Sequence, residues 1–392
     1  MGTYASFYGM EESWFEAKGA AYTSLEIARQ GELWRKLLGI LGEKKDEISS
    51  FMGRMGDLRN LRVILTGAGS SAYVGEVAAL INGKTAKIRC EPIATTDIVS
   101  SPRSVLFADI PTLMVSFARS GNSPESVCAL QYARSIVKDL WELAIVCDGD
   151  SALAKLSGES SKSMVLAMPG ESNDKGFAMT SSVTCMNLAC YAFFNIDKLA
   201  DIGRDIGFIA GFIEKEGLKF TEIARSWAEK DYERLIIIGS GCCKGLAREA
   251  ALKSMELSAG EVNTNYESSM GFRHGPKAVI KDNTLTVHFI SPDPLCAKYD
   301  IDLLKEIGNQ RKGNKIITLS TAPLPVEADE SIIIPKAGGN ADSEFFFGIC
   351  ALVFCQLLAM FKSMQLGLTA DNPVPGGEIT RVVSGVTLYP LE

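Results

Sequence analysis

The 392-residue sequence contains only two histidines, and its ten cysteines include no C-x-x-C pair. Zinc sites are usually built from clusters of these two residue types, so the sequence offers little to hold a metal. We therefore expect no metal and no other cofactor. The cysteines are scattered through apolar strand and helix segments, which predicts reduced, buried thiols rather than disulfides.

The sequence also lacks an excess of basic residues. Its 40 Lys and Arg are outnumbered by 47 Asp and Glu, for a net charge of -7. Nucleic acids and anionic membranes bind basic surfaces, so neither is expected as a partner. The first twenty residues contain no basic stretch followed by an apolar run, which favours a cytoplasmic protein over a secreted one. The longest apolar run, residues 345–361, includes Gln356 and is predicted to be a buried helix rather than a membrane span.

One segment of the sequence occurs twice. VILTGAGSSAYVGEVAAL at 63–80 returns 172 positions later as LIIIGSGCCKGLAREAAL at 235–252, and the same offset brings TLMVSF at 112–117 onto TLTVHF at 284–289. Several segments kept in one register indicate a duplicated domain. The two copies differ after the glycines, where the first has Ser70-Ser71 and the second has Cys242-Cys243.

Short apolar segments alternate with helical ones in both copies. The predicted strands are 63–66, 86–90, 112–117, 143–147 and 164–168 in the first copy, and 235–238, 284–290, 315–319 and 331–334 in the second. This alternation predicts the α/β class, with two parallel sheets covered by helices on both faces. Long helical stretches are expected at 181–227 and 342–364.

The chain is accordingly divided into five parts. They are an N-terminal helical arm at 1–60, a first domain at 61–200, a connecting helical segment at 201–230, a second domain at 231–370, and a tail at 371–392. The tail opens with the Pro/Gly-rich segment 371–377, which breaks any helix and leads to an extended piece at 380–388. We expect this tail to lie over an active site.

The first Gly-rich turn, Gly67 to Ala72, admits three interpretations. It fits the loose dinucleotide-binding pattern, with Glu91 available as the acidic residue after the second strand. It also fits phosphate binding by Ser70, Ser71 and backbone N–H groups at a helix start, where the helix dipole favours an anion. The structural alternative is that Ser70 only caps its helix.

A second polar turn favours the phosphate interpretation. Arg119, Ser120, Gly121, Asn122 and Ser123 follow another predicted strand of the same sheet and precede a helix that starts at a proline. The carboxyl ends of parallel strands meet at one edge, so both turns are expected in the same crevice. The predicted phosphate-binding residues are Gly69, Ser70, Ser71, Arg119, Ser120, Asn122 and Ser123. At the matching positions the second copy has Cys242-Cys243 and Ser291-Pro292-Asp293-Pro294, and only the first copy is expected to bind an anion.

Acid/base groups are concentrated in the second copy. Glu249 and Glu256 are seven residues apart on a predicted helix, which places them on nearly the same face. A solvated helix face is the alternative for either carboxylate alone. His274 lies in the loop GFRHGPK, bounded by glycine and proline, where it can be presented to a ligand. His288, inside a predicted strand, is interpreted as a packed core residue.

These motifs together resemble the sugar isomerase (SIS) domain family. The segment EAALKSME at 249–256, the later His274-Gly275-Pro276 and the Ser-Gly-Asn-Ser turn are similar to the isomerase half of glucosamine-6-phosphate synthase. The resemblance implies two tandem SIS domains, each a flavodoxin-like parallel sheet in an α-β-α sandwich. It further implies that Glu256 moves a proton between C1 and C2, that His274 opens the sugar ring, and that Glu249 supports the substrate.

The sequence departs from the synthase pattern in several ways. It begins Met1-Gly2-Thr3, without the synthase's glutamine-hydrolysing domain, so ammonia from glutamine is not expected. Ser384 stands where the synthase has its Schiff-base lysine, and Arg119 stands where it has glutamine. The SSPRS segment at 100–104 and the tail bring the chain closer to the bacterial galactosamine-6-phosphate deaminase/isomerase branch, also labelled tagatose-6-phosphate ketose/aldose isomerase.

The resemblance implies an enzyme that converts D-galactosamine 6-phosphate to D-tagatose 6-phosphate and ammonia. The expected partners are therefore a hexosamine 6-phosphate or ketohexose 6-phosphate and further copies of the chain, in a homodimer or higher homo-oligomer. His274 would then be able to reach a neighbouring subunit's site. Two alternatives remain open, namely a ketose/aldose isomerase without deamination and a non-catalytic phosphosugar-binding protein.

Overall fold

The computed structural model describes residues 3–310, 313–339, 342–383 and 385–391. The chain forms two units, each described by itself below. The first-copy unit comprises residues 32–174, 181–204 and 376–392, and the second-copy unit comprises residues 1–31, 175–180 and 205–375.

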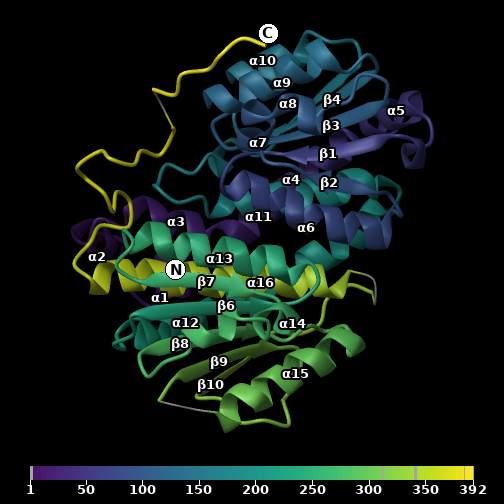
Figure 1. Ribbon diagram of the computed structural model, residues 1–392. Coiled ribbons are helices and arrows are strands. Elements are labelled where there is room, and N and C mark those ends of the chain that lie inside the picture. Colours follow the sequence, from purple (N-terminus) through teal and green to yellow (C-terminus); the bar gives the residue numbers. More distant parts are fainter. Residues whose placement is uncertain (1–2, 311–312, 340–341, 384, 392) are drawn as a thin grey trace. The chain divides into compact units, whose positions relative to one another are not determined.

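The first-copy unit is built on a five-stranded parallel sheet (Figure 1). Its strands are β1 (Arg62–Thr66), β2 (Cys90–Pro92), β3 (Thr112–Ala118), β4 (Leu140–Val146) and β5 (Ser163–Ala167), in the order β2-β1-β3-β4-β5. This flavodoxin-like order confirms the predicted class, with its switch point between β1 and β3.

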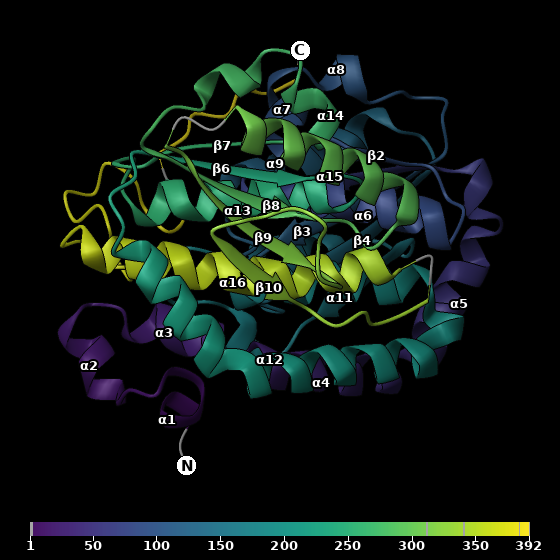
Figure 2. The ribbon, with the colours of Figure 1, turned by 90° about the horizontal axis from the view of Figure 1, so that it is seen from below.

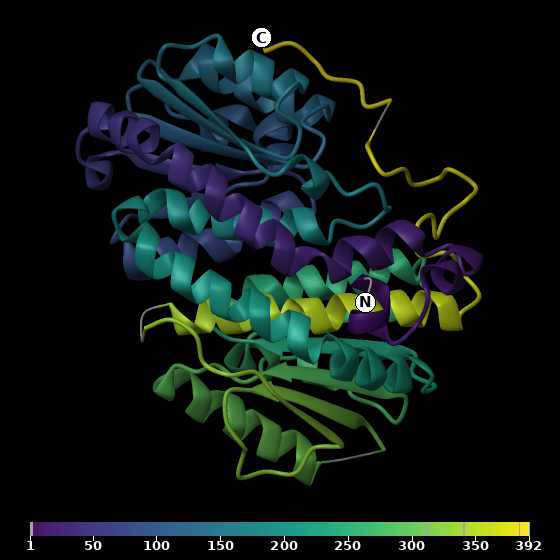
Figure 3. The ribbon, with the colours of Figure 1, turned by 180° about the vertical axis from the view of Figure 1, so that it is seen from behind.

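Helices cover both faces of this sheet. They are α4 (Gln30–Glu43), α5 (Lys45–Met55), α6 (Ser70–Thr85), α7 (Thr95–Ser100), α8 (Pro102–Val105), α9 (Pro124–Ile136), α10 (Ala152–Gly158) and α11 (Ser181–Phe194), with 3-10 turns η1 (Leu58–Asn60), η2 (Gly170–Ser172) and η3 (Ile196–Lys198). Alternate strand residues Ile64, Met114 and Ala144 pack with α7, α9 and α10, as the two-residue period of a strand requires. The Trp34 indole N–H donates to Thr184 Oγ1 at 3.0 Å, and this bond joins α4 to α11. Figure 3 shows the ribbon from behind.

The second-copy unit repeats the same sheet. Its strands are β6 (Arg234–Gly239), β7 (Asn263–Glu267), β8 (Thr284–Phe289), β9 (Lys315–Ser320) and β10 (Glu330–Ile333), all parallel, in the order β7-β6-β8-β9-β10. The strand order therefore matches that of the first copy element by element, as a duplicated domain predicts.

The helices of this unit complete a second sandwich. They are α1 (Thr3–Tyr8), α2 (Glu12–Ala17), α3 (Ala21–Ala28), α12 (Leu199–Ala228), α13 (Cys243–Leu257), α14 (Ser269–Phe272), α15 (Pro294–Asn309) and α16 (Ser343–Gln365), with a 3-10 turn η4 (Pro276–Val279). Ile236, Ile238 and Ile316 pack with α14 and α15 on one face. Helices α13 and α16 run side by side (Figures 1 and 2).

Helix α16 confirms the prediction of a buried helix at 345–361. By length and composition it is the one helix of the described residues that could cross a membrane, yet its most apolar window is entirely buried inside the protein. Its buried polar side chain Gln356 is hydrogen-bonded on both sides. Gln356 accepts a 2.8 Å hydrogen bond from Gln30 and donates to the carbonyl of Thr180 at 3.2 Å.

Two predicted elements were wrong in place or extent, and one strand was not predicted. The strand expected at 86–90 is β2 at Cys90–Pro92, because α6 continues to Thr85 and Lys87 turns the chain at a positive φ of 59°. Strand β7 was missed, since its sequence NTNYE has no apolar run. The helical stretch 181–227 is interrupted at Asn195, between α11 and α12.

Candidate active site

The two predicted phosphate turns follow neighbouring strands of one sheet. Gly67 follows β1, and Arg119 follows β3. The two strands are parallel neighbours, with Thr66 opposite Ser116 near their carboxyl ends. Strand β2 lies on the other side of β1, so both turns stand at the switch point of the sheet. Ligands of open α/β sheets bind in this crevice.

The first turn is shaped by its two glycines. A Cβ on Gly67 would lie 2.5 Å from the Cβ of Ser71, so only glycine lets the helix begin this close to the strand. Gly69 has a positive φ of 56° and open space where a side chain would stand. Helix α6 begins immediately afterwards, with Ser70 and Ser71 both buried in its first turn.

Two alternatives for this turn lose support. The N-cap position of α6 is Gly69, so Ser70 is not the capping residue of its helix. Glu91, the acidic residue that a dinucleotide site would use, is bound by Arg62 at 2.6 Å. Hydrogen bonding from this guanidinium lowers the pKa of the Glu91 carboxyl.

The second turn is held by the start of α10 and by a hydrogen bond of its own. Gly121 has a positive φ of 62° and is crowded by Ser151, while Asn122 accepts a 3.0 Å hydrogen bond from the Ala152 N–H. The Ser120 hydroxyl accepts from the Asn122 N–H at 3.3 Å. Ser123 is the N-cap of α9 but makes no side-chain capping bond, which leaves its hydroxyl available to a ligand at a helix N-terminus.

Arg119 binds the C-terminal tail. Its guanidinium donates a 2.7 Å hydrogen bond to the carbonyl oxygen of Arg381. The Arg381 side chain in turn donates to the Asp174 carbonyl at 2.8 Å and to Asn173 Oδ1 at 2.9 Å. The tail therefore contacts one of the predicted phosphate-binding residues, while Ser384 lies outside the described residues.

Helix α13 presents a row of three charged side chains. Glu249 and Lys253 are almost completely buried, and Glu256 is partly exposed, with a side-chain exposure of 27%. Lys253 Nζ lies 3.3 Å from Glu249 Oε1 and 2.6 Å from Glu256 Oε2. Lys253 thereby pairs with both carboxylates, and Glu256 is the one that reaches solvent.

Lys253 is the residue that sequence reasoning missed. Lys253 is part of the EAALKSME motif, four positions after Glu249 and three before Glu256, so it lies on the same helix face as both. A lysine on a helix is ordinarily solvated, so its complete burial could not be read from the sequence.

His274 lies in an exposed loop between α14 and η4. The loop is held by Glu306 of α15, which accepts from Arg273 Nε at 2.9 Å and also from Lys277. These two hydrogen bonds lower the pKa of the Glu306 carboxyl. Among the described residues, His274 makes no hydrogen bond or ion pair with Glu249 or Glu256. His288, by contrast, is buried in β8, as predicted.

The phosphate turns belong to the first-copy unit, and the Glu249–Lys253–Glu256 row and His274 belong to the second-copy unit. That the phosphate turns and the acid/base residues share one crevice stays a prediction.

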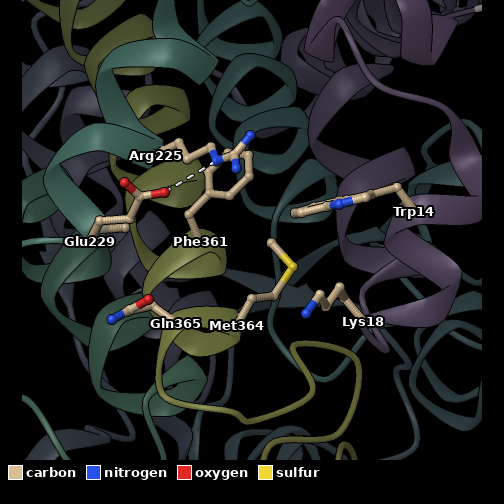
Figure 4. Close-up of a pocket in the computed structure, with 8 residues that line it drawn as sticks. Trp14, Lys18, Arg225, Glu229, Phe361, Met364 and Gln365 are labelled. Atoms are coloured by element: carbon tan, nitrogen blue, oxygen red, sulfur yellow. Dashed lines mark hydrogen bonds and ion pairs between the residues drawn. The ribbon is translucent and has the colours of Figure 1, made fainter.

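A separate cavity of about 160 Å³ contains none of the predicted site residues (Figure 4). It is lined by Trp14, Lys18, Arg225, Ala228, Glu229, Phe361, Met364 and Gln365. Arg225 pairs with Glu229 at 3.4 Å and stacks over the Trp14 ring at 5.7 Å, so its charge is already compensated.

All ten cysteines are described, and none of them forms a disulfide, as predicted. One cluster of potential metal ligands occurs in the described part of the chain, where Cys242, Cys243 and Glu344 place ligand atoms within 4.8 Å of one another.

The SIS domain family model matches residues 59–196. The chain is 38% identical to the D-galactosamine-6-phosphate deaminase AgaS of Shewanella sp. (strain ANA-3), over 95% of this chain and 93% of that protein. A solved structure from Clostridium novyi NT, provisionally assigned as a tagatose-6-phosphate ketose/aldose isomerase, is 40% identical with a TM-score of 0.93 over 98% of both chains. The tagatose-6-phosphate ketose/aldose isomerase of Escherichia coli is 33% identical with a TM-score of 0.86, over 94% of this chain and 96% of that one. The chain thus belongs to the SIS domain family.

Proposed function

We propose that this chain is a deaminating aldose–ketose isomerase that converts D-galactosamine 6-phosphate to D-tagatose 6-phosphate and ammonia. The observation that carries the proposal is the nearly full-length similarity to a protein named D-galactosamine-6-phosphate deaminase. The similarity to proteins named tagatose-6-phosphate ketose/aldose isomerase is consistent with the same product sugar.

The phosphate is assigned to the turns after β1 and β3. Small neutral donors and helix N-termini suit a phosphate in a protein whose net charge is negative, because they need no cationic surface. Gly69, Ser70 and Ser71 form one side of this site, and Ser120, Asn122 and Ser123 form the other. Arg119 adds a cation that also holds the tail.

Glu256 is assigned as the base. In the open-chain sugar it removes the proton from C2, whose bonding electrons form the C1–C2 double bond of an enolamine while O1 is protonated. The proton is then returned to C1, which leaves a ketimine at C2. Water adds to C2 and expels ammonia, giving the ketose. The partial exposure of Glu256 and the buried Lys253 beside it suit a carboxylate that exchanges a proton with a ligand.

The remaining roles follow the family resemblance. His274 assists ring opening, and Glu249 supports the substrate through the row that it forms with Lys253. The protein acts in the cytoplasm as a homodimer or higher homo-oligomer, with His274 placed to serve its own site or that of a neighbouring subunit.

The test is to incubate the pure protein with galactosamine 6-phosphate and to measure ammonia and ketose together. We expect both in equal amounts. Interconversion of neutral sugar phosphates with no ammonia from the amino sugar would instead identify a plain isomerase, and tight binding without turnover would identify a sensor.

The base is tested by Glu256→Gln, which should lower kcat by about 10²- to 10⁴-fold while substrate binding is retained. Glu261→Gln, at an exposed position just beyond the same helix, is the matched control and should keep full activity. Full activity of Glu256→Gln would remove Glu256 as the base.

A further inference from the structure

The Gly-rich turns of the two copies have the same backbone geometry. Gly69 and Gly241 have φ values of 56° and 57°, and each turn is closed by an equivalent hydrogen bond of 3.1 Å, from Ser71 to Ala68 and from Cys243 to Ser240. The preceding glycine is crowded in both copies, since a Cβ on Gly239 would lie 2.6 Å from the Cys243 carbonyl oxygen. The turn therefore has the same backbone conformation whether serines or cysteines follow its second glycine.

What fills the two turns differs. A Cβ on Gly69 would meet nothing within 4 Å, whereas a Cβ on Gly241 would lie 2.5 and 2.6 Å from the two carboxylate oxygens of Glu344. Glu344 belongs to the first turn of α16 and is only 6% exposed. The chain thus places one of its own carboxylates in the second turn, at the start of α13.

The carboxylate is bound from two sides. The Ser291 hydroxyl donates to Glu344 Oε1 at 2.7 Å, and the Cys242 thiol lies 3.5 Å from Oε2. Ser291 follows β8 as Arg119 follows β3, at the same offset of 172 positions. The two loops that hold Glu344 are therefore the counterparts of the two loops assigned to phosphate in the first copy.

We propose that the second Gly-rich turn is an anion-binding site whose ligand is the carboxylate of Glu344, which replaces an external phosphate. The sequence comparison of the copies indicates only that the second turn lacks serine donors; the structure assigns it an occupant. By tying the start of α13 to α16, this contact also holds the helix that carries Glu249, Lys253 and Glu256. The inference concerns the second copy and holds whatever the enzyme's substrate is.

A metal is the competing occupant of the same cluster. Hydrogen bonding with Cys242, burial and the nearby charge of Glu344 all raise the pKa of the Cys243 thiol well above its ordinary value. The Cys243 thiol lies 3.5 Å from the backbone carbonyl oxygen of Glu344, and a protonated thiol is a poor metal ligand because metals bind the thiolate. The geometry and the thiol chemistry together favour the internal carboxylate.

The experiment is anion rescue of Glu344→Ala. Formate and inorganic phosphate should raise the melting temperature of this variant by at least about 2 °C more than they raise that of the wild type. Gln356→Ala removes another buried polar side chain from the same helix and is the matched control. It should gain no more than the wild type, because its cavity is not at a helix N-terminus.

Glu344→Gln is the second variant, since it keeps the side-chain shape if Glu344→Ala does not fold. Replacing the bound carboxylate by a neutral amide should lower the melting temperature by about 2–5 °C at neutral pH, with no response to formate. A variant as stable as the wild type would overturn the proposal. So would equal rescue of Glu344→Ala and Gln356→Ala, or a zinc ion bound by the wild type and lost in Glu344→Gln.

Discussion

Nζ of Lys253 lies 2.6 Å from Oε2 of Glu256, three positions further along α13. The lysine is completely buried, so its charge depends on the carboxylates beside it for compensation. Glu249, one turn before, supplies the second of them at 3.3 Å. The assigned base is thus one end of a buried ion triad rather than an isolated carboxylate.

Lys253→Met should destabilise the protein by about 3–5 kcal/mol, because it removes the cation that lies 3.3 Å from the buried carboxylate of Glu249. Urea unfolding measures this loss. Adding Glu249→Gln to Lys253→Met should recover part of the stability, since the uncompensated charge is then gone. Lys138→Met, which removes one partner of an exposed pair, is the control and should change stability by less than about 0.5 kcal/mol. An equally small effect of Lys253→Met would contradict the triad.

Arg119→Gln should loosen the tail at Arg381, because the side chain that donates to the Arg381 carbonyl loses its charge and its reach. Losing a charge-assisted hydrogen bond shifts local opening by about 10-fold or more. Cleavage after Glu378 by a glutamyl endopeptidase should accelerate accordingly. Arg89→Gln, at an exposed position of the same unit, should leave the rate unchanged. Equal cleavage rates in the two variants would show that Arg119 does not hold the tail.

His288 should make the protein sensitive to acid. Burial lowers the pKa of this imidazole to about 3, against an ordinary value of about 6.5. As the pH falls below about 6.5 the unfolded chain takes up a proton that the folded protein does not. The stability is therefore fully present above that pH and declines toward pH 3, by at most about 1.4 kcal/mol per pH unit.

The measurement is the slope of the melting temperature between pH 7 and pH 5, compared between the wild type and His288→Phe, so that contributions of other groups cancel. The variant should have the shallower slope. A steep slope in His288→Phe would assign the acid sensitivity to other groups.

Much of the architecture was predictable because its signals are local. The apolar strands around Val63 and Leu235 and the helix start at Pro124 were identified from short-range periodicity and turn residues. The strand Asn263–Glu267 was not, because a polar edge strand is defined by its pairing with β6 rather than by its own composition. The prediction of one continuous helix across Asn195 was wrong for a related reason, because the apolar pattern on either side does not mark the interruption.

The sequence by itself determined the duplication, the α/β class, the two polar turns of the first copy and the positions of Glu249, Glu256 and His274. These depend on residue identity and spacing along one strand, turn or helix. Only the tertiary structure decided that Lys253 is buried between two carboxylates, that Arg119 binds the tail at Arg381, and that Glu344 fills the second turn. Burial depends on what packs over a helix, and the last two contacts join residues about 100 or more positions apart, which local spacing does not encode.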